Sequence, residues 1–211
     1  MKIRLFSLVE IGSHGILWVA LLITMFVSLL IGCGVPTMGA YVLVAILVAP
    51  ALVHMGTTLL AAHLFCFYFA VFSTVTPPVA TAALPASSLS GGKYFETAVE
   101  AFKISIVAFI IPFVFVYNTA FLTDISNPLS AVVSIVAFGL SILPLAAVLA
   151  GQYLTRLNWL GRGFAAITAA VLVGCAVNAF GQSYLLFAVG VVLFVAFTLW
   201  QRAKRRAQAV Y

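Results

Sequence analysis

Long apolar runs, separated by short polar or charged stretches, make up most of this chain. No Asp, Glu, Lys or Arg occurs in residues 11–92 or in residues 163–201. Apolar residues follow one another within these runs, whereas the strands of a membrane barrel alternate between apolar and polar residues. The pattern therefore predicts an all-α polytopic membrane protein whose charged residues lie between its spans.

Two short apolar arms joined by a turn follow the first segment. Residues 1–13 are mixed in character, which is typical of a segment lying at the membrane interface. Residues 16–31 and 38–53 are apolar runs, each about 24 Å long as a helix and shorter than the roughly 30 Å hydrocarbon core. We expect residues 14–53 to form a re-entrant helical hairpin with its tip at residues 32–37.

A broken helix is expected next, over residues 59–89. The apolar run stops at residues 73–78, which read Ser-Thr-Val-Thr-Pro-Pro, and then resumes. Pro77 has no backbone N–H, and Pro78 disfavours the helical conformation at Pro77, so an unbroken helix cannot pass through this stretch.

A surface helix and about four spans complete the prediction. Residues 93–103 carry charged residues at helical spacing, which favours a short helix on the membrane surface. Spans are expected at residues 105–122, 129–150, 163–179 and 184–200. The chain then divides into the interfacial segment 1–13, a transport repeat half at 14–122, and C-terminal helices with a basic tail at 129–211.

Composition agrees with a membrane protein and limits its partners. Hydrophobic residues make up 65% of the chain and charged residues 7%, against about 25% charged in soluble proteins. The net charge is +6, and the tail carries four of the ten basic residues: Arg202, Lys204, Arg205 and Arg206. A basic cluster beside a last span is typical of a cytoplasmic end near anionic lipid, so we expect a lipid bilayer and no nucleic acid as partner.

The positive-inside rule sets the orientation. It places the basic tail, the loop carrying Arg156 and Arg162, and the helix at residues 93–103 in the cytoplasm, and the turn at Asp124 outside. The three cysteines lie within apolar runs and lack the paired spacing of a metal site, so they read as small buried hydrophobes and we expect no transition metal. These are Cys33, Cys66 and Cys175.

Oxygen atoms gather at both interruptions. A helix broken at membrane depth leaves backbone groups that hydrocarbon cannot satisfy, whereas a bound ion can. Thr37 follows the first interruption, and Thr74 and Thr76 lie within the second. Neutral oxygens and the C-terminal ends of half-helices suit a small hard cation such as Na⁺. Gly and Pro also produce ordinary kinks in membrane helices, but two successive interruptions with Thr at both favour an ion site.

Six stretches of the chain are distinctive when taken together. They are Gly-Cys-Gly-Val-Pro-Thr-Met-Gly-Ala-Tyr at residues 32–41, Ala-Pro-Ala-Leu at 49–52, Ala-Ala-His-Leu-Phe-Cys-Phe-Tyr-Phe-Ala at 61–70, Thr-Pro-Pro-Val-Ala at 76–80, Glu-Ala-Phe at 100–102 and Pro-Phe-Val-Phe-Val-Tyr-Asn at 112–118. These stretches resemble the fused permease subunit of TRAP transporters (4TM/12TM type). The TAXI-associated branch is the most similar. The likeness is specific over residues 12–122 and compositional afterwards.

The resemblance implies a sodium-coupled, ATP-independent importer of organic acids in a bacterial or archaeal cytoplasmic membrane. Such an importer works with an extracytoplasmic solute-binding protein and needs no cofactor besides Na⁺ as coupling ion. The Gly-Pro-Thr stretch resembles the tip of the second transport hairpin, and the Thr-Pro-Pro stretch resembles the broken-helix loop opposite. The implied Na⁺ site comprises Gly32, Gly34, Thr37, Thr74, Thr76 and Pro77, and substrate contacts cannot be assigned singly.

The resemblance covers one inverted repeat. The chain therefore resembles the C-terminal half of such a permease, with a separately encoded N-terminal half as partner. The alternative is a truncated, non-transporting remnant or a structural membrane protein. Two other hypotheses concern His63, which could couple protons but more often packs between helices, and an intramembrane serine protease pair of Ser90 with His63. Ser90 lies at a helix end beside a charged residue, so we expect no enzyme.

Overall fold

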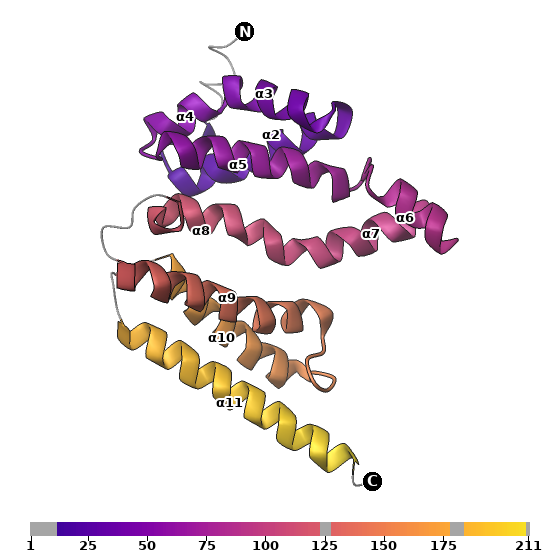
Figure 1. Cartoon of the computed structure of the whole chain (residues 1–211), viewed down its shortest axis with the longest axis vertical. Coiled ribbons are helices and arrows are strands. Elements are labelled where there is room, and N and C mark those ends of the chain that lie inside the picture. The colour runs from indigo at the N-terminus through magenta and orange to yellow at the C-terminus, as the bar shows by residue number, and fades with distance from the viewer. Residues whose placement is uncertain (1–11, 123–127, 178–183, 210–211) are drawn as a thin grey trace. The chain divides into compact units, whose positions relative to one another are not determined.

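The computed structural model describes residues 12–122, 128–177 and 184–209 (Figure 1). Helices and the turns between them make up this part of the chain, which contains no strand of a sheet. Its apolar helices long enough to cross a membrane lie at Leu17–Gly34, Tyr94–Tyr117, Pro128–Ala150, Trp159–Ala176 and Tyr184–Arg206. The predicted all-α polytopic membrane fold is thereby confirmed.

The chain forms two compact units, Met1–Val116 and Tyr117–Tyr211. Unit 1 begins with the hairpin, in which α2 (Leu17–Gly34) turns at Val35 and Pro36 into α3 (Thr37–Leu47). The first arm, expected over residues 16–31 and too short to span, instead stays helical through Gly34 and is long enough to cross a membrane. The second arm, expected as one run over residues 38–53, is divided at Val48, where α4 (Ala49–His54) begins. Pro50 explains the division, because it has no N–H to donate to the preceding turn.

The break in the next helix lies where the sequence predicts it. α5 (Leu59–Phe72) starts at Thr58, whose hydroxyl accepts the N–H of Ala61 at 3.2 Å, and continues into a 3₁₀ turn, η1 (Ser73–Val75). Residues 76–82 are not helical, and the next helix is α6 (Ala83–Ser90). It ends at Gly91, which has a φ of 68°. Such a left-handed residue is a common helix stop.

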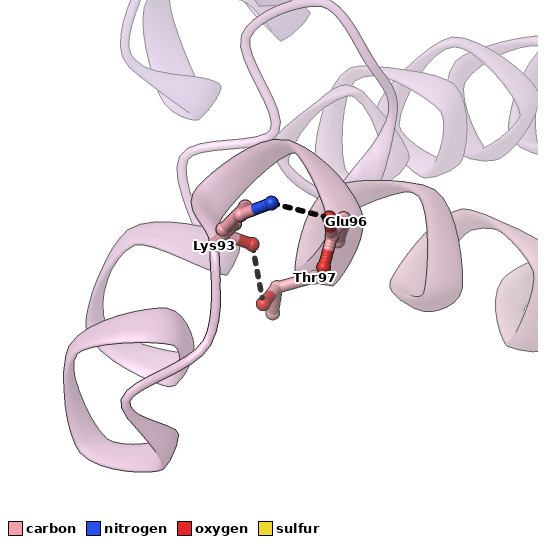
Figure 2. A network of polar contacts seen from close by, with 3 residues as sticks. All are labelled: Lys93, Glu96 and Thr97. Atoms are coloured by element: carbon pink, nitrogen blue, oxygen red, sulfur yellow. Dashed lines mark hydrogen bonds and ion pairs between the residues drawn. The ribbon is translucent and has the colours of Figure 1, made fainter.

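From Tyr94 the chain stays helical to Tyr117. It passes through α7 (Tyr94–Ser105), η2 (Ile106–Ile110) and α8 (Ile111–Tyr117), so the expected surface helix and the following span adjoin without a non-helical residue. Figure 2 shows how α7 begins: the ammonium of Lys93 pairs with Glu96 at 3.3 Å, and its carbonyl accepts the Thr97 hydroxyl at 3.0 Å. The charges that suggested a surface helix thus lie on the first turns of a longer element.

That element ends earlier than expected, at Tyr117 rather than at residue 122. Asn118 leaves the helical conformation, and its side chain accepts the N–H of Ala120 at the start of the turn η3 (Thr119–Phe121). A side chain that caps a new turn competes with continuation of the helix. The expected Asp124 turn and most of the 1–13 segment lie outside the described residues.

Aromatic rings form the centre of unit 1. Phe65 and Phe69 of α5 meet Phe113 of α8 edge to face, with centroids 5.2 and 6.1 Å apart, and Phe109 of η2 lies 5.3 Å from Phe72. Edge-to-face pairs contribute about 0.5–1.5 kcal/mol each beyond burial. The aromatic residues of α5 therefore fix the broken helix on the helical run that follows it.

Unit 2 consists of α9 (Pro128–Ala150), α10 (Trp159–Ala176) and α11 (Tyr184–Ala209). The buried amide of Asn118 donates to the hydroxyl of Ser134 at 3.0 Å and to the carbonyl of Ala176 at 2.7 Å. Asn118 therefore bonds to α9 and α10. Together with Tyr94–Tyr117, these three helices account for the about four spans expected after the broken helix.

Candidate functional site

The hairpin tip and the helix break meet at one close contact. A Cβ added to Gly32, near the end of α2, would lie 2.6 Å from the Cβ of Ser73 and 3.2 Å from the carbonyl of Ala70. Real Cβ atoms do not approach this closely, so only glycine allows the two backbones to come together. The two interruptions that the sequence singles out therefore lie side by side in unit 1.

Small residues form a stripe along the face of α2 that makes this contact. Ala20, Thr24, Ser28 and Gly32 recur every fourth residue, and the first three are fully buried. Small side chains on one helix face let another helix approach closely. The stripe continues the same face of α2 toward the break.

Three hydroxyl groups at the start of the break donate to the turn before it. Ser73 donates to the carbonyl of Ala70 at 2.7 Å, Thr74 to that of Val71 at 2.8 Å and Thr76 to that of Phe72 at 2.7 Å. A hydroxyl that has donated its hydrogen retains two lone pairs. Each oxygen is thus set to accept a further donor or a cation.

Backbone bonds across the break hold its shape. The N–H of Thr76 donates to Ser73 at 3.2 Å, and that of Ala82 donates to Thr74 at 2.9 Å. The hydroxyl of Tyr94, at the start of α7, donates to the carbonyl of Val79. The break is therefore a folded loop anchored at both ends, in which the Pro77–Pro78 bond is cis.

Two helix ends with the same polarity converge here. α2 ends at Gly34, two residues beyond Gly32, and α5 ends beside Ser73. The carbonyl end of a helix carries a partial negative charge of about half an electron. The contact thus joins two negative helix ends, and the described residues place no Lys or Arg on either of them.

The predicted ligands differ in their surroundings. Gly34 is exposed, and no heavy atom lies within 4 Å of a Cβ built on it. Thr37 is half-buried in the first turn of α3, and Thr74, Thr76 and Pro77 are half-buried in the break. Gly32 is the predicted residue that carries the contact between the interruptions.

Ser73 is the residue that sequence reasoning did not place in the site. It is 1% exposed and faces Gly32. Serine is common in turns and loops, so a serine just before a proline-containing stretch does not by itself indicate a site. The available signal was the four-residue spacing of small residues on α2, which indicates a face that approaches another helix closely. The spacing does not say which residue lies opposite.

His63 and Ser90, the residues of the proton-coupling and protease hypotheses, both bond to nearby groups. His63 lies one turn into α5, and its Nδ1 is 3.1 Å from the hydroxyl of Tyr41 in α3, so it links the hairpin to the broken helix. Ser90 donates to the carbonyl of Ser87 at 3.3 Å and accepts the N–H of Gly92. His63 therefore takes part in helix packing, and Ser90 in ending α6.

A helical hairpin whose tip meets the break of a discontinuous helix is typical of one class of membrane proteins, the secondary transporters. The family model described as "Tripartite ATP-independent periplasmic transporter, DctM component" matches residues 6–130, and the chain belongs to this family. It is thus a TRAP transporter permease component, which fits a protein that is not an enzyme. No curated protein and no solved structure matches the chain significantly.

Proposed function

We propose that the chain is a sodium-coupled permease component that imports organic acids and binds one Na⁺ where the hairpin tip meets the helix break. The observation that carries the proposal is the contact of Gly32 with Ser73, which brings two carbonyl ends of helices together. The proposed ligands are Gly32, Gly34, Thr37, Thr74, Thr76 and Pro77. Their neutral oxygens suit a hard monovalent cation better than a transition metal.

The hydroxyls support this assignment. Thr74 and Thr76 each donate to a carbonyl of the preceding turn, which directs their hydrogens away and leaves oxygen lone pairs for the ion. The ion would offset the negative ends of α2 and α5. Binding would therefore fix the hairpin tip against the break, and release would loosen it.

The partners follow from the family. We propose an extracytoplasmic solute-binding protein that delivers the organic acid, a bacterial or archaeal cytoplasmic membrane as the site of action, and membership of the TAXI-associated branch. The described residues contain one hairpin and one broken helix, whereas transporters of this type place their sites between two repeats. We therefore also propose a companion permease chain that carries the other repeat.

A natural thiol reports on the proposed site. Cys33 lies between Gly32 and Gly34 and is half-buried, whereas Cys66 and Cys175 are buried. In the full chain with Cys66→Ala and Cys175→Ala, Na⁺ is expected to slow maleimide alkylation of Cys33 several-fold relative to K⁺ at equal ionic strength. The measurement is the alkylation rate in proteoliposomes, followed by mass spectrometry.

Threonine variants locate the effect. Thr76→Val is expected to abolish the protection by Na⁺, because it removes a ligand oxygen without changing side-chain size greatly. The matched control is Thr81→Val, at an exposed position beyond the break, which should retain protection. Equal alkylation in Na⁺ and K⁺ for the parent protein would reject the sodium site, and loss of protection in both variants would reject its location.

A further inference from the structure

Six basic residues occur at one end of unit 2 without a compensating acid. We call them the basic cluster: Arg156, Arg162, Arg202, Lys204, Arg205 and Arg206. Residues 128–211 contain no Asp or Glu. Like charges gathered on one surface repel each other, so this surface favours an anionic partner from outside the chain.

Hydrogen bonds join the two segments that carry the cluster. Lys204 of α11 donates to the carbonyl of Arg156 in the α9–α10 loop at 3.3 Å. The neighbouring Gln201 is fully buried, and its Oε1 accepts from the hydroxyl of Thr155 at 2.8 Å and from its N–H at 3.3 Å. The loop and the end of α11 therefore form one platform.

Arg162 belongs to the same platform. Its guanidinium lies over Gly151, where an added Cβ would be 3.0 Å from the Cζ of Arg162. Gly151 has a φ of 69° and begins the loop. The cluster thus covers the start of the loop, its middle and the adjoining end of α11.

Aromatic side chains mark the depth of the platform in a membrane. A Cβ on Gly161 would lie 3.2 Å from the indole of Trp200, so this ring rests on the first turn of α10, and Lys204 Nζ lies 5.8 Å from its centre. Trp159 and Leu160, in that same turn, are 88% and 87% exposed. Tryptophan is enriched at the level of lipid headgroups, which places the basic cluster at that level.

We propose that the basic cluster binds the phosphates of an anionic phospholipid, and that cardiolipin, with two phosphates, binds best. The cations lie on two segments, the α9–α10 loop with the start of α10, and the end of α11, so a lipid with two phosphates matches them better than a lipid with one. An acidic protein segment would match the charge but would leave Trp159 and Leu160 exposed, whereas a lipid covers them with acyl chains.

The test uses the detergent-solubilised full chain with cardiolipin, phosphatidylglycerol, phosphatidylcholine or inorganic phosphate added. With cardiolipin at about ten times its Kd, Tm is expected to rise by about 3–6 °C. Phosphatidylglycerol should act more weakly, and phosphatidylcholine and inorganic phosphate should have no effect. An equal shift with inorganic phosphate, or none with cardiolipin, would overturn the proposal.

Matched double variants separate a site from general charge attraction. Arg156→Gln with Lys204→Gln should lose most of the cardiolipin shift, whereas Lys93→Gln with Lys103→Gln in unit 1, which removes two charges as well, should keep it. If the first pair does not fold, Arg202→Gln with Arg206→Gln tests the same surface, because both side chains are exposed. Equal loss in the control pair would refute a site on unit 2.

Discussion

At the scale of single residues, Gly32 has the most constrained environment in the candidate site. Gly32→Ala places a methyl group 2.6 Å from the Cβ of Ser73, and such overpacking costs about 1–3 kcal/mol. Gly34→Ala is the matched control, because its Cβ meets no atom within 4 Å. We expect Gly32→Ala to lower Tm in detergent and Gly34→Ala to leave it nearly unchanged.

A second substitution tests the cause of that loss. Ser73→Gly removes the atoms nearest to the new methyl group, so the double variant Gly32→Ala with Ser73→Gly should recover part of the stability relative to the sum of the single effects. Coupling between residues in contact is the expected sign of a shared packing site. Strict additivity of the two effects would show that Gly32 is constrained by something other than Ser73.

At the scale of elements, the sequence predicts where helices break better than where they continue. Glycine and proline act locally, so residues 32–37 and 73–78 are visible as interruptions before any fold is known. The join of α7 to α8 is not visible, because Glu96, Glu100 and Lys103 indicate a surface helix when read alone. The opposition of Gly32 and Ser73 is a tertiary contact between small residues, whose types do not specify a partner.

The loop of the broken helix depends on its anchor to α7. Tyr94→Phe removes the hydroxyl that donates to the carbonyl of Val79, so the backbone of the loop should open more often. We expect faster hydrogen exchange at the amides of Ala80 and Ala82, which bond within the loop. Tyr41→Phe removes a hydroxyl from the contact with His63 and serves as control, since it should leave these two amides unchanged.

At the scale of the whole molecule, the contacts within unit 2 bear on its orientation in the membrane. The α9–α10 loop is hydrogen-bonded to the end of α11, so Arg156, Arg162 and the basic tail share one side of the bilayer. The positive-inside rule counts basic residues in such short loops and near span ends. All six cations of the basic cluster then act together, and they favour a cytoplasmic C-terminus.

Reporter fusions measure this orientation directly. A green fluorescent protein joined after Tyr211 should fluoresce in bacterial cells, and alkaline phosphatase at the same position should be inactive, because the first folds in the cytoplasm and the second requires an oxidising compartment. Replacing all six cations by glutamine should raise phosphatase activity, since it removes the charge bias. Lys93→Gln with Lys103→Gln is the control, because these are the basic residues among the described part of unit 1. This pair removes two charges rather than six, so it controls only in part for the loss of charge. Active phosphatase on the unaltered chain would place the C-terminus outside, and the basic cluster would then face the outer leaflet.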